Sequence, residues 1–249
     1  MVSGKYSALS GAIAREQSIA NTSANLANVS TIGYKKTRMS FESILKEEQQ
    51  IADTKGINYS RVKGNYIDFS QGPLKETDSP LDVAIMGDGF FKIRSAQGDL
   101  LTRKGNFVLD DTGRLLTDTG MPVLNNGGGE IFIRAEDTAS IVIDRAGNIT
   151  GVGANGEQTP FGQLAIVDVD DKSLLENELD TAYSVPPEAL EIPAENFRIS
   201  QGSLEVSNVN MTDEMTKMIY DNRLFQAYHS VLESYSKLGE KLEALGTLA

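Results

Sequence analysis

Hydrophobic and polar positions follow three different patterns along the chain. Residues 5–32 carry widely spaced large apolar residues among many alanines, with no proline, and this pattern predicts a helix that ends at Gly33. Because alanine dominates its faces, this helix can bury little area against its own chain. An isolated helix of this kind is marginal in water. We therefore expect it to pack closely against a second helix.

The C-terminal segment has a heavier repeat of seven residues, which predicts a coiled-coil seam over residues 211–245. Asn210 is the expected N-cap, and Asp213 and Glu214 complement the positive end of the helix dipole. At 1.5 Å per residue, this helix is roughly 50 Å long, more than a compact domain needs. The repeat consists of Met211, Met218, Phe225 and Leu232, with Tyr228, Tyr235 and Leu242 at the three-residue offset.

Between the two helices the apolar positions alternate with a period of two. Val83 and Ile85 alternate before Gly87, Phe91 and Ile93 alternate after it, and turn signals then recur at short intervals. This pattern predicts an all-β middle domain. The predicted class is thus α+β, with an all-β domain inserted between terminal helices that pair as a coiled coil. The predicted divisions are a helical domain of residues 1–35 and 208–249, connecting extended segments at 36–75 and 186–207, and a β domain at 76–185.

One internal similarity flanks the predicted β domain. Residues 69–77 read FSQGPLKET, and residues 199–207 read ISQGSLEVS. The two copies lie where the chain enters and leaves that domain, which suggests that the two strands run side by side. Chance similarity over nine positions is the alternative interpretation.

Composition and charge exclude several function classes. The 249 residues contain 23 Lys and Arg against 35 Asp and Glu, a net charge of −12, and no Cys, which excludes disulfide scaffolds, thiol nucleophiles and Cys-ligated metals. No apolar run approaches the ~18 residues of a membrane span. No cleavable secretion signal precedes the first helix, so these features alone indicate a cytosolic protein.

The charge is unevenly distributed, with +4 over residues 1–63 and −16 over the rest. This asymmetry suits head-to-tail contact between chains, and a solvated face explains it equally well. The dense basic cluster, which consists of Lys35, Lys36 and Arg38, is too small a footprint for nucleic acid on so acidic a chain.

Candidate chemistry is sparse, and we predict no catalytic, cofactor-binding or metal site. His229 is the single histidine and has no metal-ligand partner at helical spacing. Asp168, Asp170 and Asp171 cluster at the end of a strand, where a turn explains them better than glycosidase chemistry. Residues 151–156 spell GxGxxG, but no helix can follow them, so they predict a β turn rather than a dinucleotide site.

Three asparagines give the strongest signal. Asn21, Asn25 and Asn28 lie on one helix face among alanines, where their amides can hydrogen-bond across a close helix interface and fix its register. A solvated polar face is the alternative. The predicted assembly interface consists of Leu9, Ile13, Asn21, Asn25, Leu26, Asn28 and Gly33, together with Met211, Met218, Phe225, Tyr228, Leu232, Tyr235 and Leu242.

Residues 20–36, ANTSANLANVSTIGYKK, resemble the N-terminal signature of bacterial flagellar rod and hook proteins. The resemblance continues through residues 70–91, 102–124 and 201–210, so it spans most of the chain. Within the family, the short passage between Gly33 and Phe69 is more similar to the proximal-rod type than to the distal-rod type. The last helix follows the family pattern loosely.

The resemblance implies a structural subunit of the flagellar basal-body rod, with paired helices forming the inner layer of a helical tube and the β domain facing outward. It also implies export through the flagellar type III apparatus to the periplasmic basal body, which replaces the cytosolic interpretation. The implied partners are other rod and axial subunits and the export apparatus, with no cofactor, nucleic acid, membrane insertion or small-molecule substrate. A distal-rod subunit, a periplasmic peptidoglycan-acting or sugar-binding β protein, and a secreted adhesion module are the alternatives.

Overall fold

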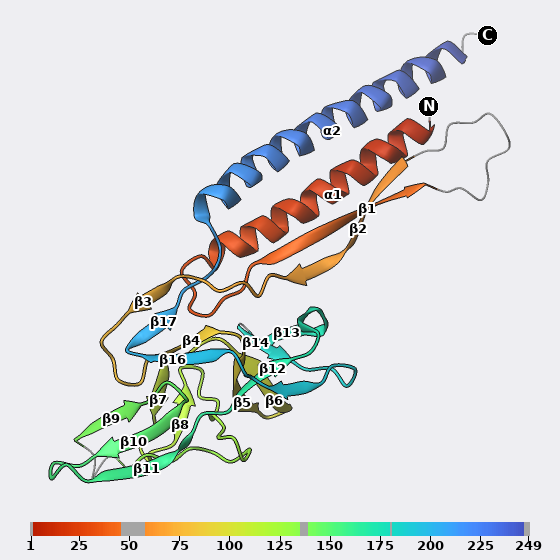
Figure 1. Ribbon diagram of the computed structural model, residues 1–249. Helices are drawn as coiled ribbons and strands as arrows, with labels where there is room; N and C mark the ends of the chain where they lie inside the picture. Colours follow the sequence, from red (N-terminus) through yellow and green to blue (C-terminus); the bar gives the residue numbers. More distant parts are fainter. Residues whose placement is uncertain (1, 46–57, 135–138, 180, 247–249) are drawn as a thin grey trace. The chain divides into compact units, whose positions relative to one another are not determined.

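The computed structural model describes residues 2–45, 58–134, 139–179 and 181–246, and side chains over 4–40, 64–134, 139–179 and 181–241. The N-terminal helix α1 (Val2–Ala27) and the C-terminal helix α2 (Met211–Gly246) enclose a mostly β middle in the chain order (Figure 1). The predicted α+β class is confirmed.

The chain divides into two compact units, which differ from the predicted divisions. The first, here called the helical unit, contains residues 1–27, 37–68 and 209–249. The second, here called the β unit, contains residues 28–36 and 69–208. The two segments that the sequence predicts as extended connections therefore belong largely to one unit or the other.

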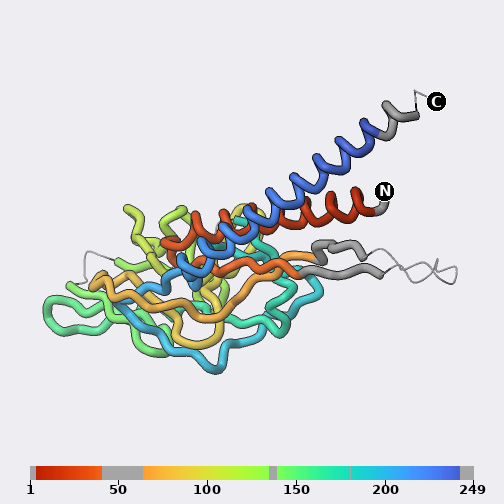
Figure 2. Tube along the Cα trace, turned by 90° about the horizontal axis from the view of Figure 1, so that it is seen from above, coloured from red at the N-terminus to blue at the C-terminus, as the bar shows by residue number. Residues whose placement is uncertain are grey.

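In the helical unit, α1 and α2 run antiparallel and lie side by side (Figures 1 and 2). The hairpin of β1 (Thr37–Leu45) and β2 (Asn58–Ile67) contacts α1 as well. Residues 36–75 were expected to be a connection, but a strand pair satisfies backbone N–H and C=O groups that a lone extended segment would leave without partners. Pairing of this segment with itself explains the difference.

Helix α1 ends at Ala27, and the prediction that it continues to Gly33 is wrong. The Thr31 hydroxyl donates to Oδ1 of Asn28 at 3.0 Å, and the Thr31 N–H donates to the Asn28 carbonyl at 3.2 Å. Side-chain bonds of this kind compete with the helical backbone pattern and close a turn. Gly33 instead serves the β unit: its φ is +71°, and a Cβ there would lie 2.6 Å from the Lys104 nitrogen.

Three sheet groups build the β unit, and every strand pair is antiparallel. The six-stranded sheet has the order β13-β14-β6-β5-β12-β15, and a three-stranded sheet has the order β11-β10-β9. Strands β16-β4, β17-β3 and β7-β8 form two-stranded pairs. The bounds are β3 Leu74–Glu76, β4 Val83–Gly87, β5 Phe90–Ser95, β6 Gly98–Thr102, β7 Phe107–Leu109, β8 Leu115–Thr117, β9 Ser140–Ile143, β10 Asn148–Val152, β11 Gln158–Gln163, β12 Ile166–Val169, β13 Glu176–Leu179, β14 Ala182–Ser184, β15 Glu191–Pro193, β16 Phe197–Gln201 and β17 Ser203–Glu205, with a short 3-10 helix at Lys172–Leu174.

The return segment 186–207 was predicted as a connection, but it carries β15, β16 and β17. These strands pair with β12, β4 and β3 respectively, so the segment completes sheets that the entering chain begins. The pairing of β3 with β17 confirms that the two similar sequences run side by side. Their glutamines act alike: Gln71 binds the backbone of Ile85, and Gln201 binds that of Ile141.

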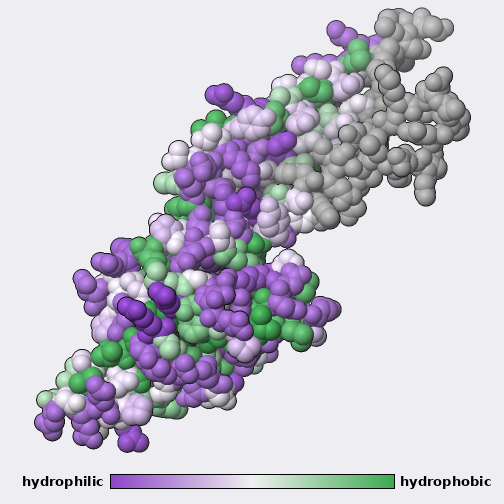
Figure 3. Space-filling model, in the orientation of Figure 1, coloured by the Kyte–Doolittle hydropathy of each residue, from purple (hydrophilic) through white to green (hydrophobic). Residues whose placement is uncertain are grey.

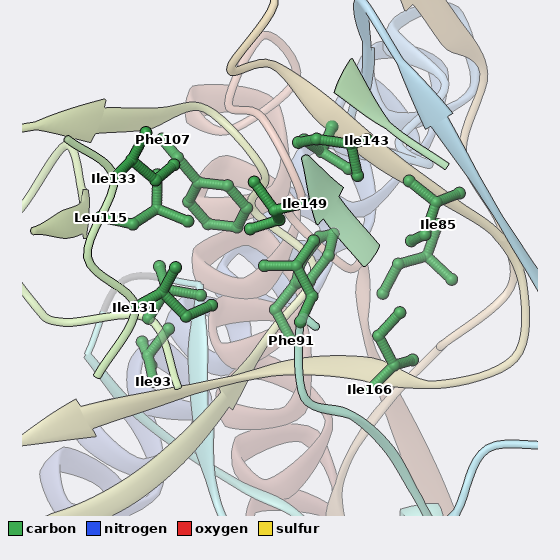
Figure 4. Close-up of a cluster of buried hydrophobic side chains, with 14 of the residues drawn as sticks. Ile85, Phe91, Ile93, Phe107, Leu115, Ile131, Ile133, Ile143, Ile149 and Ile166 are labelled. Atoms are coloured by element: carbon green, nitrogen blue, oxygen red, sulfur yellow. The ribbon is translucent and has the colours of Figure 1, made fainter. Parts of the chain in front are cut away.

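The alternating apolar residues of the sequence form the core of the β unit (Figure 4). Phe91 and Phe107 pack edge to face with ring centroids 5.1 Å apart, a favoured aromatic geometry. The core therefore joins strands from different sheets. Its labelled members are Ile85, Phe91, Ile93, Phe107, Leu115, Ile131, Ile133, Ile143, Ile149 and Ile166.

A single five-residue turn recurs in this unit. In each copy the first N–H donates to the fifth carbonyl, the fourth N–H donates to the first carbonyl, and the fourth residue is a glycine with φ between 75° and 86°. This is the three-residue hairpin loop with a glycine bulge. The copy at 153–157 confirms that the GxGxxG sequence is a β turn. The five copies span residues 110–114, 117–121, 125–129, 144–148 and 153–157.

Candidate assembly site on the helical unit

The inner face of α1 is made of small residues that face large or acidic residues of α2. A Cβ on Gly11 would lie 2.6 Å from Cζ of Tyr228, and a Cβ on Gly4 would lie 2.5 Å from the Tyr235 hydroxyl. A larger residue at either position would require the facing tyrosine side chain to shift, so glycine allows the two helices to approach closely with these tyrosines in place. The two contacts are seven residues apart on both helices, which is the spacing of a coiled-coil seam.

The next step along this seam is polar. The Asp221 carboxylate is buried, with its residue 1% exposed, and it accepts hydrogen bonds from Arg15 Nη1 at 2.8 Å and from the Ser18 hydroxyl at 2.6 Å. A buried carboxylate is tolerated when charged and hydrogen-bonding partners satisfy it. Asp221 thus links α2 to α1 at one fixed position along the two helices.

The last step of the seam pairs Asn25 of α1 with Glu214 of α2. Asn25 is 0% exposed, and its Nδ2 lies 3.4 Å from Glu214 Oε2. The same amide donates to the Thr37 carbonyl at 2.9 Å and accepts from the Thr37 N–H at 3.0 Å, while Asn21 donates to the same carbonyl. The prediction assigned these amides to contacts between neighbouring helices. The structure uses Asn25 inside the helical unit, where it joins α1 to the start of β1 and to α2.

Large apolar residues lie on the outward faces of both helices. Leu9 and Ile13, one helical turn apart on α1, are 43% and 46% exposed, and Tyr6 is 57% exposed. On α2, Met215 and Ile219 are similarly exposed. Apolar patches accordingly interrupt a largely hydrophilic surface (Figure 3). Contiguous exposed apolar residues on a soluble protein mark a surface for contact with partners.

The remaining predicted interface residues fall into three groups. Met218, Phe225, Tyr228, Leu232 and Tyr235 are partly buried along α2, whereas Met211 is half exposed. Leu26 is partly buried on α1, and Asn28 and Gly33 belong to the β unit. The side chain of Leu242 lies outside the described residues. Whether any of these residues contacts another subunit stays a prediction.

Sequence reasoning missed five residues of the seam: Gly4, Gly11, Ser18, Glu214 and Asp221. Asp221 and Glu214 continue the seven-residue spacing of the two seam tyrosines toward the N-terminus of α2. An apolar repeat does not detect them because they are charged. Extending the tyrosine register through charged positions would have found both.

A second buried charge cluster lies in the β unit. Lys35 Nζ donates to Glu205 Oε1 at 2.6 Å and to the Ser70 carbonyl at 2.8 Å. Arg103 lies 3.4 Å from the other Glu205 oxygen and stacks over the Phe90 ring at 5.1 Å. Burial lowers the pKa of Arg103, an effect that the Glu205 carboxylate opposes. This cluster joins the chain entering and leaving the β unit, so its role is positional.

The candidate catalytic residues have structural roles in the chain. Asp170 accepts hydrogen bonds from the backbone of Asp171 and Leu190, Asp171 caps the 3-10 helix through Ser173, and Asp168 lies 3.2 Å from Lys172 Nζ. His229 is exposed on α2. The described part of the chain contains no cluster of His, Cys, Asp or Glu suited to a metal ion. None of its described helices is both long and apolar enough to span a bilayer.

Comparison with known proteins decides the family. Residues 84–151 match the family model described as flagellar hook protein FlgE/F/G D1 domain, and residues 200–245 match flagellar basal body rod FlgEFG protein C-terminal. The flagellar basal-body rod protein FlgG of Bacillus subtilis is 31% identical to this chain, over 97% of the chain and 98% of the relative. The chain belongs to the flagellar basal-body rod protein family.

Relatives under two names match about equally well. Flagellar basal-body rod protein FlgF of Rhizobium meliloti is 33% identical over 99% of both chains, and FlgF of Caulobacter vibrioides is 31% identical over 90% of both. The resemblance found in the sequence is therefore confirmed over the whole chain. The family is structural and is not known for enzymes, and it places the protein in the basal body as a rod subunit.

Proposed function

We propose that this rod subunit occupies the proximal rod and polymerises helically through the outward faces of α1 and α2, which pair as a coiled coil within each subunit. The observation that carries the proposal is the exposure of Leu9 and Ile13, while the inner face of the same helix holds glycine, alanine and serine. In a free chain these large side chains face water. Neighbouring subunits would cover them.

The energetics favour assembly at this surface. Burying the remaining exposed area of a side chain such as Leu9 or Ile13, which is about half exposed, gains roughly 1 kcal/mol, and several such residues lie on each subunit. A contact between two different patches of identical subunits does not need to close, so it generates a helical tube. Each helix of the antiparallel pair presents one such patch, on its face away from the seam.

The proposal also includes a route and a location. The subunit would reach the periplasmic part of the basal body through the flagellar type III export apparatus. Its partners would be other rod and axial subunits. A two-helix unit whose buried apolar residues are mostly alanines suits a chain that travels unfolded and orders when it meets its neighbours.

The test replaces the outward apolar pair of α1. In a host strain that lacks the chromosomal gene, a Leu9→Ser/Ile13→Ser variant is compared with a Leu190→Ser/Ile192→Ser variant, which removes two exposed apolar residues from the β unit. We expect the α1 variant to be exported but absent from purified basal bodies, with loss of swimming in soft agar. The control should assemble normally.

Cell fractionation separates export from assembly, and circular dichroism of the purified variants checks that both fold. If the α1 variant enters basal bodies and supports swimming as the unchanged protein does, the outward face of α1 is not the polymerisation surface.

A further inference from the structure

We infer that the buried seam of α2 accepts α1 of the same chain in one register only, and that Ser18, Arg15 and Asp221 enforce this register. The inference concerns pairing within a single subunit and does not require polymerisation. It goes beyond helix pairing as such, because it states which alternative pairings the seam rejects and by which contacts.

The observed register aligns four steps of seven residues. Gly4 faces Tyr235, Gly11 faces Tyr228, Ser18 bonds to Asp221, and Asn25 approaches Glu214. The four steps differ in chemistry: two place glycine against tyrosine, and two place a polar side chain against a carboxylate. A seam with unlike steps can distinguish one register from the next, as a single polar position does in coiled coils.

Sliding α1 by seven residues toward the C-terminus of α2 would place Ser18 against Tyr228. A Cβ at the Gly11 position already lies 2.6 Å from Cζ and 2.7 Å from Cε1 of that ring, so the Ser18 side chain would overlap the ring. Tyr228 is partly buried against α1, so moving its ring aside would expose apolar ring surface to water. This register is therefore disfavoured by packing.

Sliding in the opposite direction would place Gly11 against Asp221. Glycine has no side chain to donate, and Arg15 and Ser18 would each be displaced by about 10 Å, the length of seven helical residues. A buried carboxylate would then lose both of its partners, which is costly. This register is excluded by electrostatics, so the two neighbouring registers fail for different reasons.

The register matters for the surface of the unit. A slip of one step would also displace the outward apolar residues of α1 relative to those of α2 by about 10 Å. The inner seam therefore fixes how Leu9 and Ile13 are placed relative to Met215 and Ile219.

The absence of cysteine from the chain allows a direct test by cross-linking of introduced cysteines in the dilute full-length protein. A Cβ on Gly4 lies against the Tyr235 hydroxyl, the far end of that side chain, so positions 4 and 235 are too far apart for a disulfide and a short bifunctional thiol reagent is used instead. A Gly4→Cys/Tyr235→Cys variant reports the observed register and leaves the three inner steps unchanged. A Gly4→Cys/Leu242→Cys variant reports the register in which Ser18 meets Tyr228. We expect the first pair to be cross-linked within the molecule in most molecules and the second at least tenfold less.

Ser18→Gly then removes the proposed barrier in each background, and Ser23→Gly at an exposed position of α1 is the matched control. We expect Ser18→Gly to increase the yield of the second pair several-fold and to reduce that of the first, with no change for the control. Variants are compared only where the β unit melts as in the parent. Equal yields for the two pairs, equal effects of the two glycines, or cross-links formed only between molecules would each overturn the inference.

Discussion

Gly11 and Gly239 both interrupt long helices, and their surroundings give them opposite roles. A Cβ on Gly11 would meet the Tyr228 ring at 2.6 Å, whereas nothing lies within 4 Å of a Cβ on Gly239. Alanine is favoured over glycine in a helix interior by about 1 kcal/mol. Comparing alanine substitutions at the two sites therefore separates the effect of packing on stability from the effect of helix propensity.

We predict that Gly239→Ala raises the free energy of unfolding of the helical unit by about 0.5–1 kcal/mol. Gly11→Ala should lower it by about 1–3 kcal/mol, because overpacking against Tyr228 outweighs the gain in propensity. Urea titration followed by far-ultraviolet circular dichroism measures both. Stabilisation by both alanines would show that Gly11 is not needed for close approach of the helices.

At the scale of elements, the repeated turn gives the β unit a dependence on pH. Asp110 accepts hydrogen bonds from the Thr112 side chain and from the backbone of Arg114, and these bonds hold its pKa well below the ordinary value. The Asn148 side chain likewise lowers the pKa of Asp144 in the equivalent turn. Asn125 occupies the same position in a third copy, which shows that an uncharged acceptor fits.

A lowered pKa in the folded state stabilises the fold above the unfolded-state pKa, and the contribution is lost as the pH falls through the folded-state value. We predict that Asp110→Asn lowers the melting temperature of the β unit at pH 7, and that the deficit shrinks as the pH falls below about 4. Thermal melts of the parent and the variant across this range measure it. A deficit independent of pH would mean that the charge on Asp110 contributes nothing.

The sequence predicted those elements whose signal is local. Alternation identified the core strands that contain Ile85 and Phe91, and turn chemistry identified the five glycine turns. The N-cap at Asn210 is confirmed, because its side chain accepts a hydrogen bond from the Thr212 N–H at 3.0 Å. The end of α1, the hairpin β1–β2 and the strand β15 were missed. The end of α1 depends on a short Asn28–Thr31 turn that helix propensity outweighs in the sequence pattern, and the hairpin and β15 depend on pairing that a local pattern does not encode.

The candidate site was predicted in part for the same reason. The apolar repeat located the α2 face that carries Tyr228 and Tyr235, because large side chains recur there at coiled-coil spacing. It could not show that Asp221 lies on that face or that Asn25 turns toward Thr37. Leu9 and Ile13 were identified as interface residues, but only the structure shows that they lie opposite the inner seam.

At the scale of the whole molecule, the two units have unequal cores. The β unit buries a cluster of large aliphatic and aromatic side chains, whereas the apolar residues buried by the described part of α1 are the alanines at 8, 12 and 14. Burial of apolar area is the main source of stability. The helical unit should therefore open more readily than the β unit, as elements with few buried apolar contacts do.

Asn25→Leu tests whether the helical unit opens independently of the β unit. The substitution removes the acceptor of the Thr37 N–H and the amide that approaches Glu214, so buried polar groups of the helical unit lose partners. A loss of about 1–3 kcal/mol corresponds to amide exchange faster by roughly 5- to 150-fold where opening and closing are fast relative to exchange from the open state. We predict this acceleration in α1 and α2, with exchange in β5 and β6 unchanged, when hydrogen exchange is followed by mass spectrometry.

Phe91→Ala is the control, because it creates a cavity in the core of the β unit and should give the reverse pattern. Equal acceleration in both units by Asn25→Leu would mean that they unfold as one cooperative body. The helical unit would then not be less stable than the β unit, and ordering of the helical unit could not be coupled to assembly on its own.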